Sequence, residues 1–326
     1  MRRAILNMLG AASVLLATMG LAAAQGDYPS RPIRVVVAWP PGSGIDVLVR
    51  QLIEPLRADL GQTLVIDNRG GASGVIGAEI AAAAPPDGYT LLFTSAALTM
   101  VSALGTPTIY KVPDSFTPVA NVMWAPMILV SHPSLNFRTP RDLIALAKAK
   151  PGELIYANSG YGSPSHFAGE LFLTRSRIVA TGVSYRGSPQ AMLDLIAGRA
   201  MFLFTTTSTS LPQVRAGKVT ALAITSKQRH ALAPEIPTMD ELGYKDFNAM
   251  SYWNGLLGPK GLPLPIANRV AAAVNRSLAR PDVQASLAPA GNEIDGKSDP
   301  RSFAAMIKED FAIWTGVVKA ANIKPN

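Results

Sequence analysis

A strand, a Pro/Gly turn and a helix start stand together between Ile33 and Asp46. A run of β-forming residues ends at Trp39-Pro40-Pro41-Gly42-Ser43-Gly44, and Asp46 then opens an apolar-periodic helix. Such a turn leaves the first backbone N–H groups of the helix unpaired, and with the positive end of the helix dipole they form a site for an anion. The glycines let the backbone approach that anion without an intervening Cβ. This first loop (residues 39–46) therefore predicts anion binding, and nothing in it resembles an activated nucleophile or a metal cage.

The same pattern returns about 120 residues later. A strand expected at 154–157 runs into Asn158-Ser159-Gly160-Tyr161-Gly162-Ser163-Pro164-Ser165-His166, another turn that leads into a helix. We call residues 158–166 the second loop. Because the two loops belong to different halves of the chain, we expect them to hold one ligand between two domains.

The order of the expected elements is strand and helix in alternation, which predicts an α/β fold with mostly parallel sheets. In the first helix Pro55 should introduce a kink or an early end, and Gly61 should cap it. Strands are expected at 33–38, 63–66, 89–93, 127–131, 154–157, 178–183, 201–204 and 221–225, and helices at 46–60, 75–83, from 139, after 163, and near 265–279, 281–288 and 300–320.

The last three helices have no sheet of their own, so we expect them to pack back on the first domain. This predicts a discontinuous first lobe, 27–125 plus 249–326, and an inserted second lobe, 126–248. The chain would cross between the lobes near 125 and 248, with the ligand cleft between them.

The N-terminus has the features of an export signal. Met1-Arg2-Arg3 is a short positive region, an apolar stretch follows to about Leu21, and Ala22-Ala23-Ala24 satisfies the small-residue cleavage rule. A membrane anchor is the alternative, disfavoured because the apolar stretch is short for a span and contains Asn7. We expect cleavage after Ala24 (signal peptide 1–24) and a mature protein in a bacterial periplasm.

Composition excludes several function classes. Removing Arg2 and Arg3 leaves 28 basic and 22 acidic residues, a formal charge of +6, but the basic residues are scattered singly. Nucleic acid is therefore not an expected partner. The chain has no Cys and only three His, without metal-ligand spacing, and it has no Gly-x-Ser-x-Gly motif. We expect no metal, no cofactor and no enzymatic activity.

Several sequence blocks, in order, resemble the solute-binding receptors of the tripartite tricarboxylate transporter family, the Bug-type periplasmic binding proteins. The resemblance covers essentially all of the mature chain. It is carried by Trp39-Pro40-Pro41-Gly42-Ser43-Gly44-Ile45-Asp46, Asp67-Asn68-Arg69-Gly70-Gly71, Pro86-Asp87-Gly88-Tyr89-Thr90-Leu91, Tyr156 to Ser163, His166-Phe167-Ala168-Gly169-Glu170, Tyr185-Arg186-Gly187-Ser188, Val214 to Ala223, and Trp253-Asn254-Gly255-Leu256.

The resemblance implies a type II periplasmic-binding-protein-like fold: two lobes, each with a mostly parallel sheet flanked by helices, that close on a small carboxylate. It implies a monomer that delivers its solute to integral membrane permease subunits. Carried onto this sequence, the ligand-binding residues are Trp39, Gly42, Ser43, Gly44, Asp46, Ser95, Ser159, Gly160, Tyr161, Gly162, Ser163, His166 and Thr205.

The sequence departs from the family pattern in places. Ser43-Gly44-Ile45 stands where Gly-Ala-Thr is common, and Trp39 stands where Phe is usual. Many members place Asp-Asn after the strand at 201–204, but this chain has Thr205-Thr206-Thr207-Ser208. Without that carboxylate a ligand amine loses a partner, so our hypothesis is a simple or aromatic carboxylate rather than an amino acid.

Four side chains have two readings each. Asp46 is interpreted as an N-terminal cap that shapes the first loop, because direct contact would repel a carboxylate. His166 is either a ligand donor or a structural histidine. Arg186 is either a charge-assisted ligand contact or a surface arginine. Trp39 either walls the pocket or fills the space between the lobes.

Two alternative functions remain at this point. The segment 33–47 with Asp67 imitates a dinucleotide-binding fingerprint, but Val47 occupies the place of the third glycine and two prolines crowd the turn. A periplasmic sensor that passes its carboxylate signal to a two-component system would use the same two lobes, and neighbouring genes would distinguish it from a transport receptor.

Overall fold

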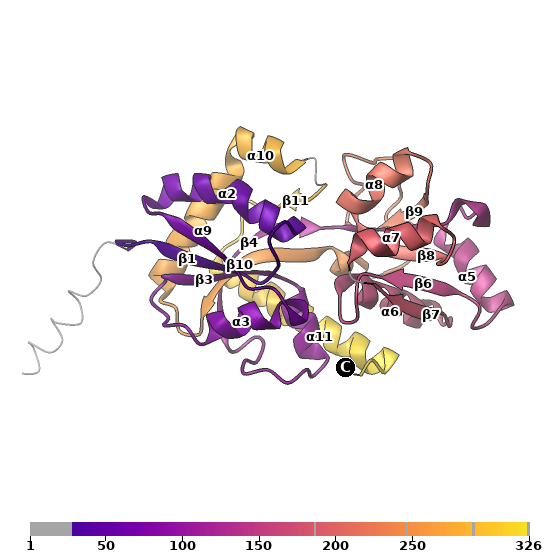
Figure 1. Ribbon diagram of the computed structural model, residues 1–326, viewed down its shortest axis with the longest axis horizontal. Helices are drawn as coiled ribbons and strands as arrows, with labels where there is room; N and C mark the ends of the chain where they lie inside the picture. The colour runs from indigo at the N-terminus through magenta and orange to yellow at the C-terminus, as the bar shows by residue number, and fades with distance from the viewer. Residues whose placement is uncertain (1–27, 186, 246, 289–290, 325–326) are drawn as a thin grey trace, which may run out of the picture.

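The computed structural model describes residues 28–185, 187–245, 247–288 and 291–324, arranged around two sheets (Figure 1). The predicted signal peptide lies outside the described residues. The first sheet has the order β11-β4-β10-β3-β1-β2. Its strands are β1 (Ile33–Val37), β2 (Leu64–Asn68), β3 (Thr90–Ser95), β4 (Phe116–Ala125), β10 (Tyr252–Pro259) and β11 (Glu293–Ile294).

Helices cover both faces of the first sheet. Consecutive strand residues point to opposite faces, and apolar side chains stand on both. Val35 and Val37 of β1 pack among the side chains of α2 and α9, whereas Val36 packs among those of α3, α4 and α11. These helices are α2 (Gly44–Leu60), α9 (Leu264–Ala279), α3 (Val75–Ala82), α4 (Ala97–Ala103) and α11 (Pro300–Ala321), with α10 (Pro281–Leu287) beside α2.

The second sheet has the order β7-β6-β8-β5-β9. It lies on the right in Figure 1, with α7 and α8 above it and α6 below it. Its strands are β5 (Met127–Ser131), β6 (Ile155–Asn158), β7 (Thr181–Ser184), β8 (Phe202–Thr206) and β9 (Thr220–Ile224), and its helices are α5 (Pro140–Ala149), α6 (Pro164–Ser176), α7 (Ser188–Ile196) and α8 (Thr207–Arg215).

Strand directions point the predicted loops at the junction of the sheets. β4 runs to that junction and passes through Pro126 into β5, which runs away from it. β10 is antiparallel to both β3 and β4, and β1 and β2 are parallel to β3, so β1, β2 and β3 end at the junction. β8 is antiparallel to β5 and parallel to β6, and β7 is parallel to β6, so these strands end there from the other side.

The predicted fold class is confirmed: two sheets flanked by helices. The sheets are mixed rather than mostly parallel. In the first sheet β10 is antiparallel to β3 and β4, and in the second sheet β5 is antiparallel to β8 and β9. Of the terminal helices, α9 and α11 pack on β4 of the first sheet and α10 packs on α2 and α9, while α11 also contacts α6 beside the second sheet.

The first helix differs from its prediction at two points. α2 begins at Gly44 rather than Asp46, because Ser43 takes the N-cap position. It also continues through the buried Pro55 to Leu60, the predicted end, so of the two effects expected of Pro55 the early end does not occur. Gly61 caps the helix in the left-handed conformation, as predicted. No helix within the described ranges has the length and apolar character needed to span a membrane.

Candidate functional site

The first loop is closed by two side chains that cap α2. Ser43 Oγ accepts from the Asp46 N–H at 3.2 Å, and Asp46 Oδ2 accepts from the Gly42 N–H at 2.8 Å. Gly42 has a φ of +78°, a conformation that glycine adopts without strain. Asp46 is therefore the third helical residue and not the N-cap that the sequence suggested, although its carboxylate does shape the loop.

The Asp46 carboxylate is almost fully buried and accepts two further hydrogen bonds. Arg50 Nε donates to Oδ2 at 3.0 Å, and Asn68 Nδ2 donates to Oδ1 at 2.9 Å and to the Trp39 carbonyl at 3.1 Å. Burial on its own would raise the pKa of Asp46, but the hydrogen bonds from Arg50, Gly42 and Asn68 together lower it below its usual value. The first loop thus contains a charge that is already neutralised within the protein.

The second loop repeats this construction with a neutral residue. Ser163 is the N-cap of α6 and accepts from the His166 N–H at 3.2 Å, and His166 Nδ1 accepts from the Gly162 N–H at 3.3 Å. Gly162 has a φ of +74°. Ser159 Oγ donates to Ser163 Oγ at 3.1 Å. Gly42, Ser43 and Asp46 of the first loop thus correspond to Gly162, Ser163 and His166 of the second.

His166 is held in its neutral form. Burial lowers its pKa to about 4, and because Nδ1 accepts from Gly162, the ring proton lies on Nε2, 3.9 Å from Glu170 Oε1. The Tyr161 ring lies against the imidazole with centroids 4.5 Å apart, and its hydroxyl donates to the Lys324 carbonyl. These contacts assign His166 a structural role in the loop, which is one of the two readings that the sequence left open.

Both loops present backbone donors without an internal acceptor. Gly44 and Ile45 in the first loop, and Tyr161 and Ser165 in the second, have N–H groups that find no acceptor among the described residues. Pro164 has no N–H, so the first turn of α6 offers one fewer donor than that of α2. Four amides at the junction are thus available to an acceptor from outside the protein.

Two of the predicted polar side chains, Ser95 and Thr205, lie at strand ends in different sheets. Ser95 ends β3 opposite Asn254 of β10, is buried, and accepts from the Ala97 N–H at 3.3 Å. Thr205 of β8 lies opposite Ile128 of β5. It is buried, and its hydroxyl has no partner within the described chain. The Trp39 ring is half-buried and its Nε1 likewise has none. Buried polar atoms of this kind point to a polar ligand or ordered water.

The site list made from the sequence omits three asparagines. Asn158 Oδ1 accepts from the Gly160 N–H at 3.0 Å. Asn158 Nδ2 and Asn254 Oδ1 are buried and have no hydrogen-bond partner among the described residues. Asn68 holds the first loop through Asp46 and Trp39. Asn158 closes the strand before the second loop and could have been found from that position. Asn254 and Asn68 reach the site only through long-range pairing. Arg186, for which the sequence left a ligand contact and a surface position open, lies outside the described residues.

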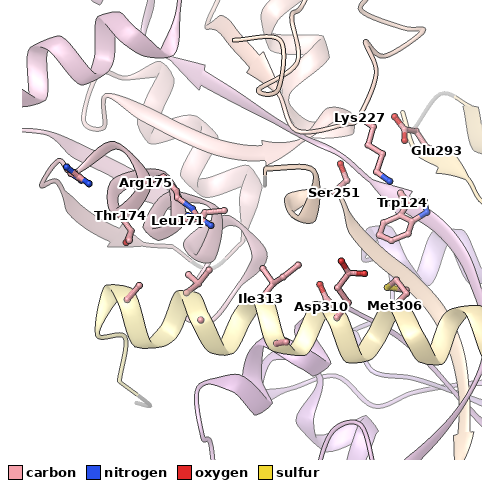
Figure 2. A pocket seen from close by; sticks show the side chains of 16 residues that line it. Trp124, Leu171, Thr174, Arg175, Lys227, Ser251, Glu293, Met306, Asp310 and Ile313 are labelled. Atoms are coloured by element: carbon pink, nitrogen blue, oxygen red, sulfur yellow. The ribbon is translucent and has the colours of Figure 1, made fainter. Parts of the chain in front are cut away.

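A large cavity lies elsewhere at the junction. It has a volume of about 1020 Å³ and is lined by residues of α11 and α6, by Trp124 of β4 and Glu293 of β11, and by Lys227 and Ser251, which lie between β9 and β10 (Figure 2). None of the sequence-predicted site residues lines it. Across the described ranges, no group of three or more His, Asp or Glu side chains could hold a metal ion.

Comparison with known proteins identifies the family of this chain. Residues 48–323 match the family described as the tripartite tricarboxylate transporter family receptor. The chain belongs to this family. A curated relative, BugT of Bordetella pertussis, is 36% identical over 322 residues, covering 98% of each chain. The resemblance found in the sequence is confirmed.

Two solved structures of similar proteins contain carboxylates. A Rhodopseudomonas palustris protein, Rpa4515 with adipate, is 31% identical with a TM-score of 0.78, covering 92% of this chain and 100% of that one. MatC from the same organism, with bound malate, is 29% identical with a TM-score of 0.75, covering 89% and 100%. The chain is thus a Bug-type solute-binding protein whose structural neighbours bind small dicarboxylates.

Proposed function

We propose that this receptor captures a small carboxylate between the first and second loops and delivers it to the permease subunits of a tripartite transporter. The observation that carries the proposal is the convergence of two helix N-termini, each with free N–H groups, from opposite sides of one junction. A carboxylate placed there would accept from the amides of Gly44 and Ile45 on one side and Ser165 on the other.

The charge state of the loops favours a carboxylate over a cation. Asp46 is balanced by Arg50 at 3.0 Å and His166 is neutral, so neither loop presents a free negative charge to the ligand. The unpartnered groups of Trp39, Asn158 and Thr205 supply polar contacts to the remainder of the solute or to water. The malate and adipate of the two structural neighbours are of this chemical class.

Position 205–208 supports a solute without an amine. The polar side chains at the end of β8 are hydroxyls, Thr205-Thr206-Thr207-Ser208, and no carboxylate stands there to pair with an ammonium group. We therefore propose a simple or aromatic carboxylate as the solute. The proposal also includes export by the N-terminal signal, action in the periplasm as a monomer, and binding without turnover.

Binding to a solute panel tests this function. The protein is unfolded, dialysed and refolded to remove bound solute, and calorimetry is run with malate, adipate, benzoate, aspartate and glutamate, with adipamide as the uncharged control. We expect heat with at least one of the first three and none with adipamide. A silent panel, preference for the two amino acids, or consumption of any solute would contradict the proposal. Uptake of the bound solute by cells with and without this chain then tests delivery.

A further inference from the structure

A contact between the two lobes lies beside the candidate site, at Gly291. Gly291 leads into β11 of the first sheet, whereas Thr207 and His230 follow β8 and β9 of the second. Thr207 Oγ1 donates to the Gly291 carbonyl at 2.7 Å, and the His230 ring hydrogen-bonds to the Gly291 backbone. Both side chains are buried. We call these three residues the Gly291 clasp.

The clasp is closely fitted. Gly291 has a φ of +66°, and a Cβ there would lie 2.6 Å from Thr207 Oγ1, so only glycine allows this approach. His230 Nδ1 accepts from the Leu232 N–H at 3.2 Å, which leaves Nε2 as the donor to Gly291. Each partner in the contact is therefore oriented by its own segment before the lobes meet.

Opposite charges flank the clasp. Lys227 and Glu293 line the same cavity, one from the second lobe and one from the first (Figure 2). Glu293 pairs with Trp124 across the strands and is half-buried, and burial raises its pKa. The segments 227–230 and 291–293 thus lie against one another with complementary charge.

The clasp is connected to the candidate ligand site through β8. Thr207 opens α8 two residues after Thr205, whose hydroxyl is buried without a partner in the described structure. The chain joins the two sheets at Pro126 and again just before Tyr252. Rotation of one lobe about these connections would separate Gly291 from Thr207 and His230, because the two sides of the clasp belong to different sheets.

We propose that the Gly291 clasp forms when the lobes close on the solute and breaks when they open. Thr207, His230 and Gly291 then set affinity without touching the solute, because their contact stabilises only the closed form. This inference deepens the proposed function and rests on it for its meaning, but its first test requires no solute.

A disulfide in place of the clasp tests whether it moves. The chain has no cysteine, so the double variant Thr207→Cys, Gly291→Cys carries a single pair. A Cβ at 291 would lie 2.8 Å from Thr207 Cβ, so the two segments must move apart by about 1 Å to reach the Cβ–Cβ distance of a disulfide, which the bond formed by oxidation would then hold. In the solute-free, oxidised double variant, we expect reduction of the disulfide to raise the radius of gyration measured by small-angle X-ray scattering. An unchanged radius, with the disulfide shown to form and to break, overturns the proposal whatever the protein binds.

Adipate exchange provides the second readout. In the oxidised double variant we expect dissociation of labelled adipate to slow at least 100-fold and to recover on reduction. Equal rates in both states would mean that the contact stays in place while the site opens, which contradicts the proposal. If wild-type protein binds neither adipate nor any other panel solute, the proposed function fails, and the scattering result still decides the clasp.

Single variants separate the clasp from general damage to α8. Thr207→Val removes the donor to Gly291, whereas the matched Thr209→Val removes a hydroxyl whose 3.1 Å contact is with Thr206 in the same lobe. We expect Thr207→Val to weaken adipate binding three- to tenfold through faster dissociation, and Thr209→Val to change it less than twofold. Unchanged or tighter binding in Thr207→Val would overturn the proposal.

Discussion

The two loops share one backbone design and differ in charge. In each, a glycine with positive φ donates its N–H to the third helical residue, and a serine caps the helix between them. That third residue is Asp46 in the first loop and His166 in the second. Asp46 is charged and balanced by Arg50, whereas His166 is kept neutral by burial.

This difference indicates how a carboxylate can be held without a free cationic side chain. The first loop is rigid because an ion pair and Asn68 fasten it, and it offers two free amides. The second loop is fastened by an uncharged acceptor, so the positive end of α6 is not opposed by a fixed anion. The account predicts that the loops fail in different ways when their third residues are changed.

The largest effect is expected from Asp46→Ala. It frees the Gly42 N–H and removes one acceptor each from Asn68 and Arg50, at a cost of about 3 kcal/mol in the free energy of unfolding. Carboxylate binding should fall more than 100-fold, because the first loop loses its closure. Urea unfolding and calorimetry measure the two effects. Glu54→Gln, which removes the negative charge of an exposed ion pair in the same helix, is the control, and similar losses in both variants would contradict the role given to Asp46.

Giving the second loop the residue of the first should be nearly as damaging to binding. His166→Asp retains an acceptor for Gly162 but places an unpaired carboxylate at the start of α6. We expect about 30-fold weaker carboxylate binding, equivalent to about 2 kcal/mol. His166→Asn, a neutral acceptor, should stay within about threefold of wild type. If His166→Asp binds like His166→Asn, the neutrality of the second loop has no function.

The pH dependence of stability separates the loops further. The folded pKa of His166 is about 4 against an ordinary value of 6.5, so the unfolded chain binds the extra proton between these values. The contribution of His166 to the free energy of unfolding should therefore be complete above pH 6.5 and should fall by about 2 kcal/mol between pH 7 and 5. Asp46, whose folded pKa is lowered, loses its contribution only in more acidic solution.

The measurement is a difference between two proteins. Two other groups also titrate in this range. Burial raises the pKa of Asp310 to about 6, so this group increases the free energy of unfolding as the pH falls toward 4, whereas burial lowers the pKa of His230, which decreases it. Both groups remain in His166→Asn, so subtracting its urea-unfolding profile from that of wild type isolates His166. A flat difference between pH 7 and 5 would show that His166 is not kept neutral in the folded protein.

Local pattern predicted much of the fold and both loops. Strand–turn–helix order, the Gly61 cap and the paired glycine–serine turns are written in neighbouring residues. The strands β4 and β10 were not anticipated, since their place depends on partners far along the chain. The role of Asp46 was misplaced by three positions because Ser43 takes the N-cap, and its contact with Asn68, 22 residues away, could not be seen in the local pattern. Pro55 was expected to kink the first helix or to end it early, but it is buried inside α2 and the helix continues past it to Leu60.

The smallest effect is expected at Thr205. Thr205→Val keeps the shape of the side chain and removes a buried hydroxyl that has no partner in the described part of the chain. Stability should be unchanged or rise by up to about 1 kcal/mol, while carboxylate affinity falls two- to fivefold. Thermal unfolding with calorimetry measures both. Unchanged affinity would remove Thr205 from the site and with it the β8 end of the proposed contact surface.

Amide resonances report most directly on whether the two loops share one carboxylate. In ¹⁵N-labelled, solute-free protein titrated with adipate, or with whichever panel carboxylate binds, we expect downfield shifts of the amide protons of Gly44, Ile45 and Ser165 along one common binding curve. Saturable binding that shifts the amides of only one loop, or of neither, would contradict the account.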